Sequence, residues 1–263
     1  MMEQIILGIV QGIAEWLPVS SEGLLVLIKT NFFAGAGMEG LIKQALFLHL
    51  GTFLAALFYF RKDVGAFLKT LISYRSADQK KKKLFNFLLI STIITGLLGY
   101  SLLKLFVGLE SHLELTGKII TLLIGLLLIV NAFFQLKAKN QGFKQIRDLK
   151  IGDSVLLGMM QGLAVLPGLS RSGLTVSSLL LKRFDETVAL KLSFLMSLPV
   201  VLAGNIILNW RAFAFSWESF LGLVFSFIFG LLTISLLLRL ARKINFGWFV
   251  LIFGGLVLAS AFV

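Results

Sequence analysis

The stretch LGIVQGIAEWLPVSSEGL at residues 7–24 decides the fold, because it recurs without a gap at residues 157–174 as LGMMQGLAVLPGLSRSGL. Each copy is a Gly-rich apolar run that breaks at a proline, Pro18 or Pro167, and then leads into hydroxyl side chains. Apolar helices that stop at a polar break, in two corresponding places, are typical of a site formed by discontinuous helices where two repeats meet inside a membrane.

The composition predicts a polytopic membrane protein, because 57% of the residues are hydrophobic and only 14% are charged. The N-terminal run carries Glu3 without a basic flank and is interrupted at Pro18, so we expect retained structure and not a signal peptide. The absence of cysteine excludes thiol chemistry, and two histidines are too few for a His-rich metal site. We assign the net charge of +12 to cytoplasmic loops in contact with membrane lipids, and we expect no nucleic-acid partner.

Six apolar windows have the length of about 20 residues that a bilayer crossing requires. They are 41–60, 84–107, 117–136, 188–208, 217–238 and 244–263. The connectors 61–83 and 137–150 are rich in Lys and Arg, which predicts that both are cytoplasmic. Between them, 108–116 contains Glu110 and Glu114 and no basic residue, so this connector is expected on the outer side.

These anchors place both ends of the first motif region outside and both ends of the second inside. The predicted fold is therefore an all-α polytopic membrane protein with an inverted repeat, in which each half is a re-entrant helical hairpin plus three transmembrane helices. We expect one membrane domain over residues 1–263. Repeat 1 covers about 1–136 and repeat 2 about 151–263, joined by the cytoplasmic loop 137–150.

The two breaks carry side chains suited to a phosphorylated ligand. Gln11 and Glu15 are four residues apart on one helix face, which favours a shared divalent cation. The second break places a guanidinium and hydroxyls where a helix begins: Ser170, Arg171, Ser172 and Thr175. Free amides at a helix start favour an anion, and an arginine fork suits phosphate oxygens. The alternative is a buried Glu15–Arg171 ion pair among closely packed small residues, although charges inside a membrane usually serve function.

These motifs resemble the undecaprenyl-pyrophosphate phosphatase family, the bacitracin-resistance type of integral membrane phosphatase. The resemblance rests on QGIAEWLPVSSEGL at 11–24 and PGLSRSG at 167–173, and extends to HLGTFLA at 49–55 and LSFLMSLP at 192–199. It implies a hydrolase that converts a polyprenyl pyrophosphate to the monophosphate and phosphate, recycling the carrier lipid for peptidoglycan synthesis. It further implies Mg²⁺ or Ca²⁺ as cofactor and a site open to the outer face of the cytoplasmic membrane. The sequence leaves the oligomeric state open, and a homodimer is one candidate.

The resemblance also implies a role for each site residue. Glu15 and Gln11 would hold the metal, Ser21 would be the nucleophile, and Arg171 would act with Glu15 in catalysis. The substrate would contact Ser20, Ser170, Ser172, Gly173 and Thr175.

Two positions depart from the family pattern. Leu24 replaces the motif histidine, and Lys191 replaces a family carboxylate further on. Glu22 and His49 are both candidates for the missing base. The second functional hypothesis is therefore a polyprenyl-phosphate carrier, or a catalytically weakened homologue with the same architecture.

Overall fold

The computed structural model describes residues 1–33, 38–113, 117–138, 142–209, 216–243 and 246–262. Glu114 and Lys139, which belong to two of the predicted connectors, lie outside these ranges. Over the described residues the chain is helical, with one isolated bridge between Lys144 and Phe184. The helices are α1 (Met2–Ala14), α2 (Ser21–Phe32), α3 (Met38–Tyr59), α4 (Arg61–Ile72), α5 (Gln79–Leu113), α6 (Gly117–Lys137), α7 (Ile151–Leu163), α8 (Arg171–Leu181), α9 (Glu186–Asn209), α10 (Trp217–Lys243) and α11 (Phe246–Ser260), with short 3-10 turns η1 (Tyr74–Ser76) and η2 (Ile146–Asp148).

Five helices are long and apolar enough to cross a bilayer, and they confirm five of the six predicted windows. These spans are Glu39–Tyr59, Gln79–Leu109, Lys118–Lys137, Glu186–Asn209 and Trp217–Leu236. The sixth window contains α11, an apolar helix of 15 residues that is shorter than a bilayer crossing of about 20 residues. The protein is an all-α multi-pass membrane protein, and its sixth crossing stays a prediction.

Both motif regions fold as a helix, a break and a second helix, which are α1 and α2 in one case and α7 and α8 in the other. The first helix of each hairpin packs on a span of the other half of the chain: α1 on α10, and α7 on α5. The repeated glycines make these contacts close. A Cβ on Gly8 would lie 2.3 Å from the Gly222 carbonyl oxygen, and one on Gly158 would lie 2.9 Å from that of Ser91.

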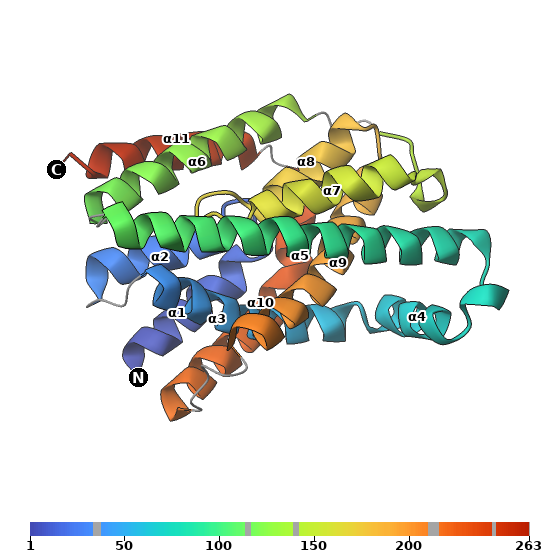
Figure 1. The fold of residues 1–263 in the computed structure, drawn as a ribbon, viewed down its shortest axis with the longest axis horizontal. Helices are drawn as coiled ribbons and strands as arrows, with labels where there is room; N and C mark the ends of the chain where they lie inside the picture. The colour runs from blue at the N-terminus through green and yellow to red at the C-terminus, as the bar shows by residue number, and fades with distance from the viewer. Residues whose placement is uncertain (34–37, 114–116, 139–141, 210–215, 244–245, 263) are drawn as a thin grey trace.

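The two hairpins start from opposite ends of the molecule in Figure 1, α1 from the left and α7 from the right. Gly8 and Gly158, which are equivalent in the two motif copies, each contact a span of the other half, as expected for related repeats. The inverted orientation of the repeats in the membrane, and their boundary at 137–150, remain predictions.

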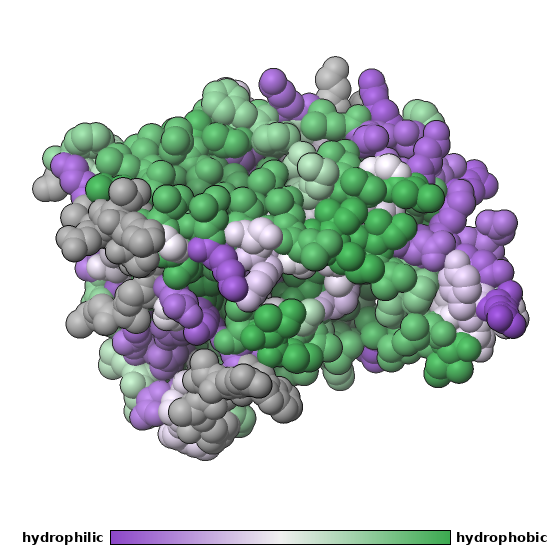
Figure 2. All heavy atoms as spheres, viewed as in Figure 1, coloured by the Kyte–Doolittle hydropathy of each residue, from purple (hydrophilic) through white to green (hydrophobic). Residues whose placement is uncertain are grey.

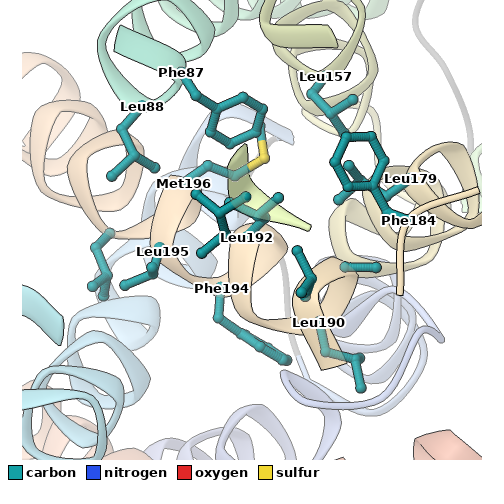
Figure 3. Close-up of a cluster of buried hydrophobic side chains, with 14 of the residues drawn as sticks. Phe87, Leu88, Leu157, Leu179, Phe184, Leu190, Leu192, Phe194, Leu195 and Met196 are labelled. Atoms are coloured by element: carbon teal, nitrogen blue, oxygen red, sulfur yellow. The ribbon is translucent and has the colours of Figure 1, made fainter. Parts of the chain in front are cut away.

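The largest hydrophobic core lies beside the breaks, where α5, α7, α8 and α9 meet (Figure 3). Phe87, Leu157 and Leu179 reach it from three of these helices, and α9 contributes Leu192 and Met196. All five side chains are buried. Because protein interiors are densely packed, this core fixes α8 and α9, which carry the polar residues of the second break.

Hydrophilic residues gather at the right end of the molecule in Figure 2, where Figure 1 places α4 and the start of α5. The basic connector 61–83 lies here, and Lys83 donates to the carbonyl of Arg147 in the second basic connector. Both connectors predicted to be cytoplasmic are thus at the same end of the bundle, as a common side of the membrane requires.

The predicted orientation can be tested by thiol labelling, because the chain contains no cysteine of its own. Glu39 lies at the start of α3 and Ser76 in η1, and both are exposed. In intact cells, an impermeant maleimide should label Glu39→Cys and should reach Ser76→Cys only after permeabilisation. The reverse pattern would overturn the orientation.

Candidate active site

Each break begins where the chain can no longer continue as a helix. In the first, Pro18 has no amide hydrogen and Ser20 has a left-handed φ of 63°. In the second, Gly168 has a φ of 106°, which favours glycine. A serine then caps each new helix, because Ser20 Oγ accepts from the Gly23 amide at 3.2 Å and Ser170 Oγ accepts from the Gly173 amide at 3.0 Å.

The two breaks contact each other directly. Ser20 Oγ also accepts from the amide of Gly168 at 3.1 Å, and Ser172 Oγ donates to the carbonyl of Leu17 at 3.2 Å. From α6, Gln135 donates to the carbonyl of Pro18 at 2.7 Å. Backbone groups released by one break are therefore bonded by the other break or by a neighbouring helix, as non-helical backbone inside a membrane requires.

The carboxylate of Glu15 lies at the centre of this contact and is 6% exposed. One of its oxygens, Oε1, pairs with the guanidinium of Arg171 across the two breaks. The other, Oε2, accepts from Gln11 Nε2 at 2.9 Å and from Ser21 Oγ at 2.9 Å. His49 Nε2 of α3 lies 3.1 Å from the same oxygen. Four side chains from three helices and the second break thus converge on one buried charge.

Arg171 is held on two further sides. Its Nη1 donates to the Ser193 carbonyl at 3.3 Å, and its guanidinium lies 5.9 Å from the centre of the Phe194 ring. Thr175 Oγ1 donates to the Arg171 carbonyl at 2.7 Å and lies 2.7 Å from Ser193 Oγ. These contacts position the guanidinium before any ligand is present.

A cavity of about 210 Å³ begins at this cluster. Its polar end is lined by Glu15, Ser20, Ser21, Glu22, His49, Ser170, Arg171 and Ser172. Its remaining wall is mostly apolar and comes from α3, α5, α9 and the second hairpin, including Leu46, Leu103 and Val165. Gly96 and Tyr100 of α5 and Ile207 of α9 line the cavity and are exposed. The cavity is therefore open on the side where the candidate spans α5 and α9 lie.

The oxygen atoms at and around Glu15 are the kind of ligand that a hard divalent cation prefers. Gln11 Oε1 is a buried amide oxygen without a hydrogen-bond partner, and Glu22 adds a second carboxylate to the cavity wall. Among the described residues, no group of three or more His, Cys, Asp or Glu side chains converges as a metal site. The protein would thus supply few ligands, and phosphate and water oxygens would supply the rest, which is the usual arrangement for Mg²⁺.

The structure brings most of the predicted site residues together, and three of them do not line the cavity. Gln11, Gly173 and Thr175 are buried and absent from the lining, and their roles stay predictions. Sequence reasoning missed Ser193, which contacts both Arg171 and Thr175. Its only signal was its place in the LSFLMSLP stretch.

The two positions that depart from the family pattern, Leu24 and Lys191, and the candidate base His49 have different surroundings. Leu24 packs against a hydrophobic cluster that includes Val26 and Leu41. His49, in contrast, contacts the carboxylate of Glu15, and its Nδ1 lies 2.7 Å from the carbonyl of Ala45. An imidazole is thus present at the polar cluster, although it comes from a different helix. Lys191 does not line the cavity and instead donates to Asp63 at 2.5 Å.

Comparison with known proteins confirms the predicted family. The family model described as bacitracin resistance protein BacA matches residues 4–257. The chain is 42% identical to an undecaprenyl-diphosphatase of Methanococcoides burtonii, over 99% of this chain and 98% of that protein. It is 38% identical to the protein of the same name in Haloarcula marismortui, over 96% and 94% of the two chains. A bacterial relative so named, from Syntrophotalea carbinolica, is 34% identical over 92% and 90%.

The central ion pair should contribute strongly to stability. Glu15→Gln leaves the guanidinium of Arg171, whose side chain is 17% exposed, without its counter-charge. Breaking a fully buried pair typically costs about 3–5 kcal/mol, so we expect a clear but smaller loss here. The control is Glu39→Gln, which breaks the exposed pair with Lys43. Thermal unfolding in detergent should show a clear loss of stability for Glu15→Gln and little loss for Glu39→Gln. Equal losses would mean that the central pair stabilises the protein no more than the exposed pair does.

Proposed function

This chain belongs to the bacitracin resistance protein BacA family, and we propose that it is an undecaprenyl-diphosphatase, as its relatives are named. The reaction would release inorganic phosphate from a polyprenyl diphosphate and leave the polyprenyl monophosphate. This step returns the carrier lipid to cell-wall polymer synthesis.

One observation supports this proposal above all others. A cluster of hydroxyls with one arginine lies at the inner end of an apolar cavity that opens between two membrane spans. A polyprenyl diphosphate has the complementary form, with a charged head and a long apolar chain. The head would lie at Arg171 and Ser21, and the chain would pass between α5 and α9 into the bilayer.

Ser21 is the nucleophile in this proposal, and Glu15 receives its proton, because the hydroxyl already donates to Glu15 Oε2. Ser21 Oγ attacks the terminal phosphorus, the bond from that phosphorus to the bridging oxygen breaks, and the polyprenyl phosphate leaves with the bonding electrons. Water then hydrolyses the phosphoserine, which restores the hydroxyl and releases phosphate. Arg171 and the free amides at the start of α8 stabilise the negative charge on the transferred group.

His49 supports the same carboxylate from α3, and we propose that it replaces the motif histidine that is absent at position 24. Its contact with Glu15 Oε2 holds the carboxylate next to Ser21. Glu22 lines the cavity, but among the described residues Ser21 is hydrogen-bonded to Glu15 and not to Glu22, so the site geometry favours Glu15 and His49.

A divalent cation, Mg²⁺ or Ca²⁺, fits beside Glu15 and Gln11. When bound, it would neutralise phosphate charge and make the phosphorus more electrophilic. The residues that hold it would be Glu15, with Gln11 Oε1 behind it and Glu22 across the cavity.

We further propose that the site faces the outer side of the cytoplasmic membrane. The cavity is lined by Ile42 near the start of α3 and by Leu208 near the end of α9. On α5 it is lined by Leu103, far from the basic residues at the start of that helix. The cavity therefore extends away from the basic end, which the charge distribution assigns to the cytoplasm.

Phosphate release from farnesyl diphosphate by purified protein tests the activity. We expect release with Mg²⁺ or Ca²⁺, none with EDTA, and none from Ser21→Ala.

Arg171→Lys keeps the charge but loses the planar fork, so its turnover should fall by about 10²-fold or more. The control is Arg183→Lys, an exposed position just beyond the end of α8. If Arg171→Lys matches the parent protein, the arginine is only structural. Release without a metal would overturn the cation proposal.

Substrates of different chain length test the lateral opening. A Cβ at Gly96 would meet nothing within 4 Å, so Gly96→Leu should fold but narrow the gap between α5 and α9. We expect the KM for undecaprenyl diphosphate to rise about tenfold, from steric exclusion of the chain. Hydrolysis of dimethylallyl diphosphate should not change. Gly255→Leu on α11 is the control, because it is exposed and also has open space. Equal effects on both substrates would contradict this route.

A further inference from the structure

A second surface of the protein is both basic and apolar and lies away from the candidate active site. This α4 surface comprises residues 61–83, which contain α4, η1 and the start of α5. Leu68, Leu71 and Ile72 of α4 are 51%, 55% and 87% exposed. With 12 residues, α4 is about 18 Å long, too short to cross a bilayer.

One side of α4 is fixed to the helix bundle. Phe67 stacks on Phe85 of α5 with ring centres 5.5 Å apart, and Asp63 accepts from Lys191 of α9 at 2.5 Å. Val64 packs against the main hydrophobic core. These contacts hold α4 in one orientation, with the three exposed apolar side chains turned away from the core.

The α4 surface has more positive charge than the protein neutralises. It contains eight basic residues and two carboxylates, so its net charge is +6. The basic residues are Arg61, Lys62, Lys69, Arg75, Lys80, Lys81, Lys82 and Lys83. Both carboxylates already have partners, since Asp63 pairs with Lys191 and Asp78 pairs with Lys81 at 2.9 Å. Lys83 also brings the basic segment around Arg147 close by. Closely spaced like charges repel, so an external anion would stabilise this surface.

We propose that the α4 surface binds the phosphate headgroups of anionic phospholipids on its side of the membrane. An interfacial helix with exposed leucine and isoleucine inserts these side chains at the headgroup boundary, while neighbouring lysines and arginines contact the phosphates. The same surface would bind nucleic acid less well, because that ligand would leave Leu68, Leu71 and Ile72 in water. This inference does not depend on the proposed phosphatase activity.

Spin-labelled lipids test the proposal on the complete protein. The protein is reconstituted into phosphatidylcholine vesicles with spin-labelled phosphatidylglycerol or spin-labelled phosphatidylcholine, and the immobilised fraction of each is measured. We expect a preference of about threefold for phosphatidylglycerol in low salt, which weakens at 0.5 M NaCl. Replacing Lys80 to Lys83 by glutamine, or making the pair Lys62→Gln and Lys69→Gln, should reduce the preference by half or more.

The matched control is the pair Lys104→Gln and Lys118→Gln. These lysines lie on α5 and α6 away from the α4 surface, 4.9 Å from the Tyr100 ring centre and 5.1 Å from that of Phe262. This variant should keep the preference for phosphatidylglycerol. A parent protein without any preference, or a control that loses it equally, would overturn the proposal. Displacement of phosphatidylglycerol by mixed-sequence RNA at low salt would also overturn it, in favour of nucleic acid.

Discussion

The ion pair between Glu15 and Arg171 is the interaction on which the rest of the structure depends. It joins two breaks that are 156 residues apart in the chain, at a place where the side chain of Glu15 is 6% exposed and that of Arg171 is 17% exposed. Charges inside a membrane are costly unless they are paired and hydrogen-bonded. The pair therefore requires the two hairpins to meet, and it gives Ser21 and His49 a common carboxylate to contact.

Close helix packing makes this meeting geometrically feasible. Gly8 and Gly158 occupy equivalent positions in the two copies of the motif, and each allows its hairpin to approach a span of the opposite half. Ser20 and Ser170 then cap the second helices in the same way. Only one of the two breaks carries the carboxylate and only the other carries the arginine. The two motif copies thus share their helix packing and caps, and they differ in the charged side chains that form the candidate site.

The sequence predicted the helical class, the two breaks and six spans, five of which the structure confirms, because apolar length, glycine, proline and repeated motifs are local signals. It also predicted that Glu15, Ser21 and Arg171 would belong to one site. It did not decide between Glu22 and His49, because that choice depends on how α3 packs beside α2. Thr175 and Gly173 were assigned to the substrate, and neither lines the cavity, because Thr175 is bonded to Arg171 and Ser193 and Gly173 packs against α6. The partner of Lys191, Asp63, is 128 residues away and had no local signal.

The apolar cavity provides space for a ligand beside this cluster, which an ion pair that only joins the hairpins would not need. A pair that served only to join the hairpins would need no opening beside it, whereas Arg171 and Ser21 both line a cavity that also has exposed residues of α5 and α9 in its wall. The low polarity of the surrounding wall also strengthens the attraction between the guanidinium and a phosphate. These features favour a lipid diphosphate over a small soluble anion.

The central claim is that one diphosphate binds between the two breaks. The most direct measurement is an experimental structure of the protein with Mg²⁺ and the methylene-bridged analogue of farnesyl diphosphate, which cannot be hydrolysed at the bridge. We expect the terminal phosphonate between Arg171 and the hydroxyl of Ser21, with the prenyl chain between α5 and α9. A phosphonate bound elsewhere, with the Glu15–Arg171 pair intact and the cavity empty, would contradict it.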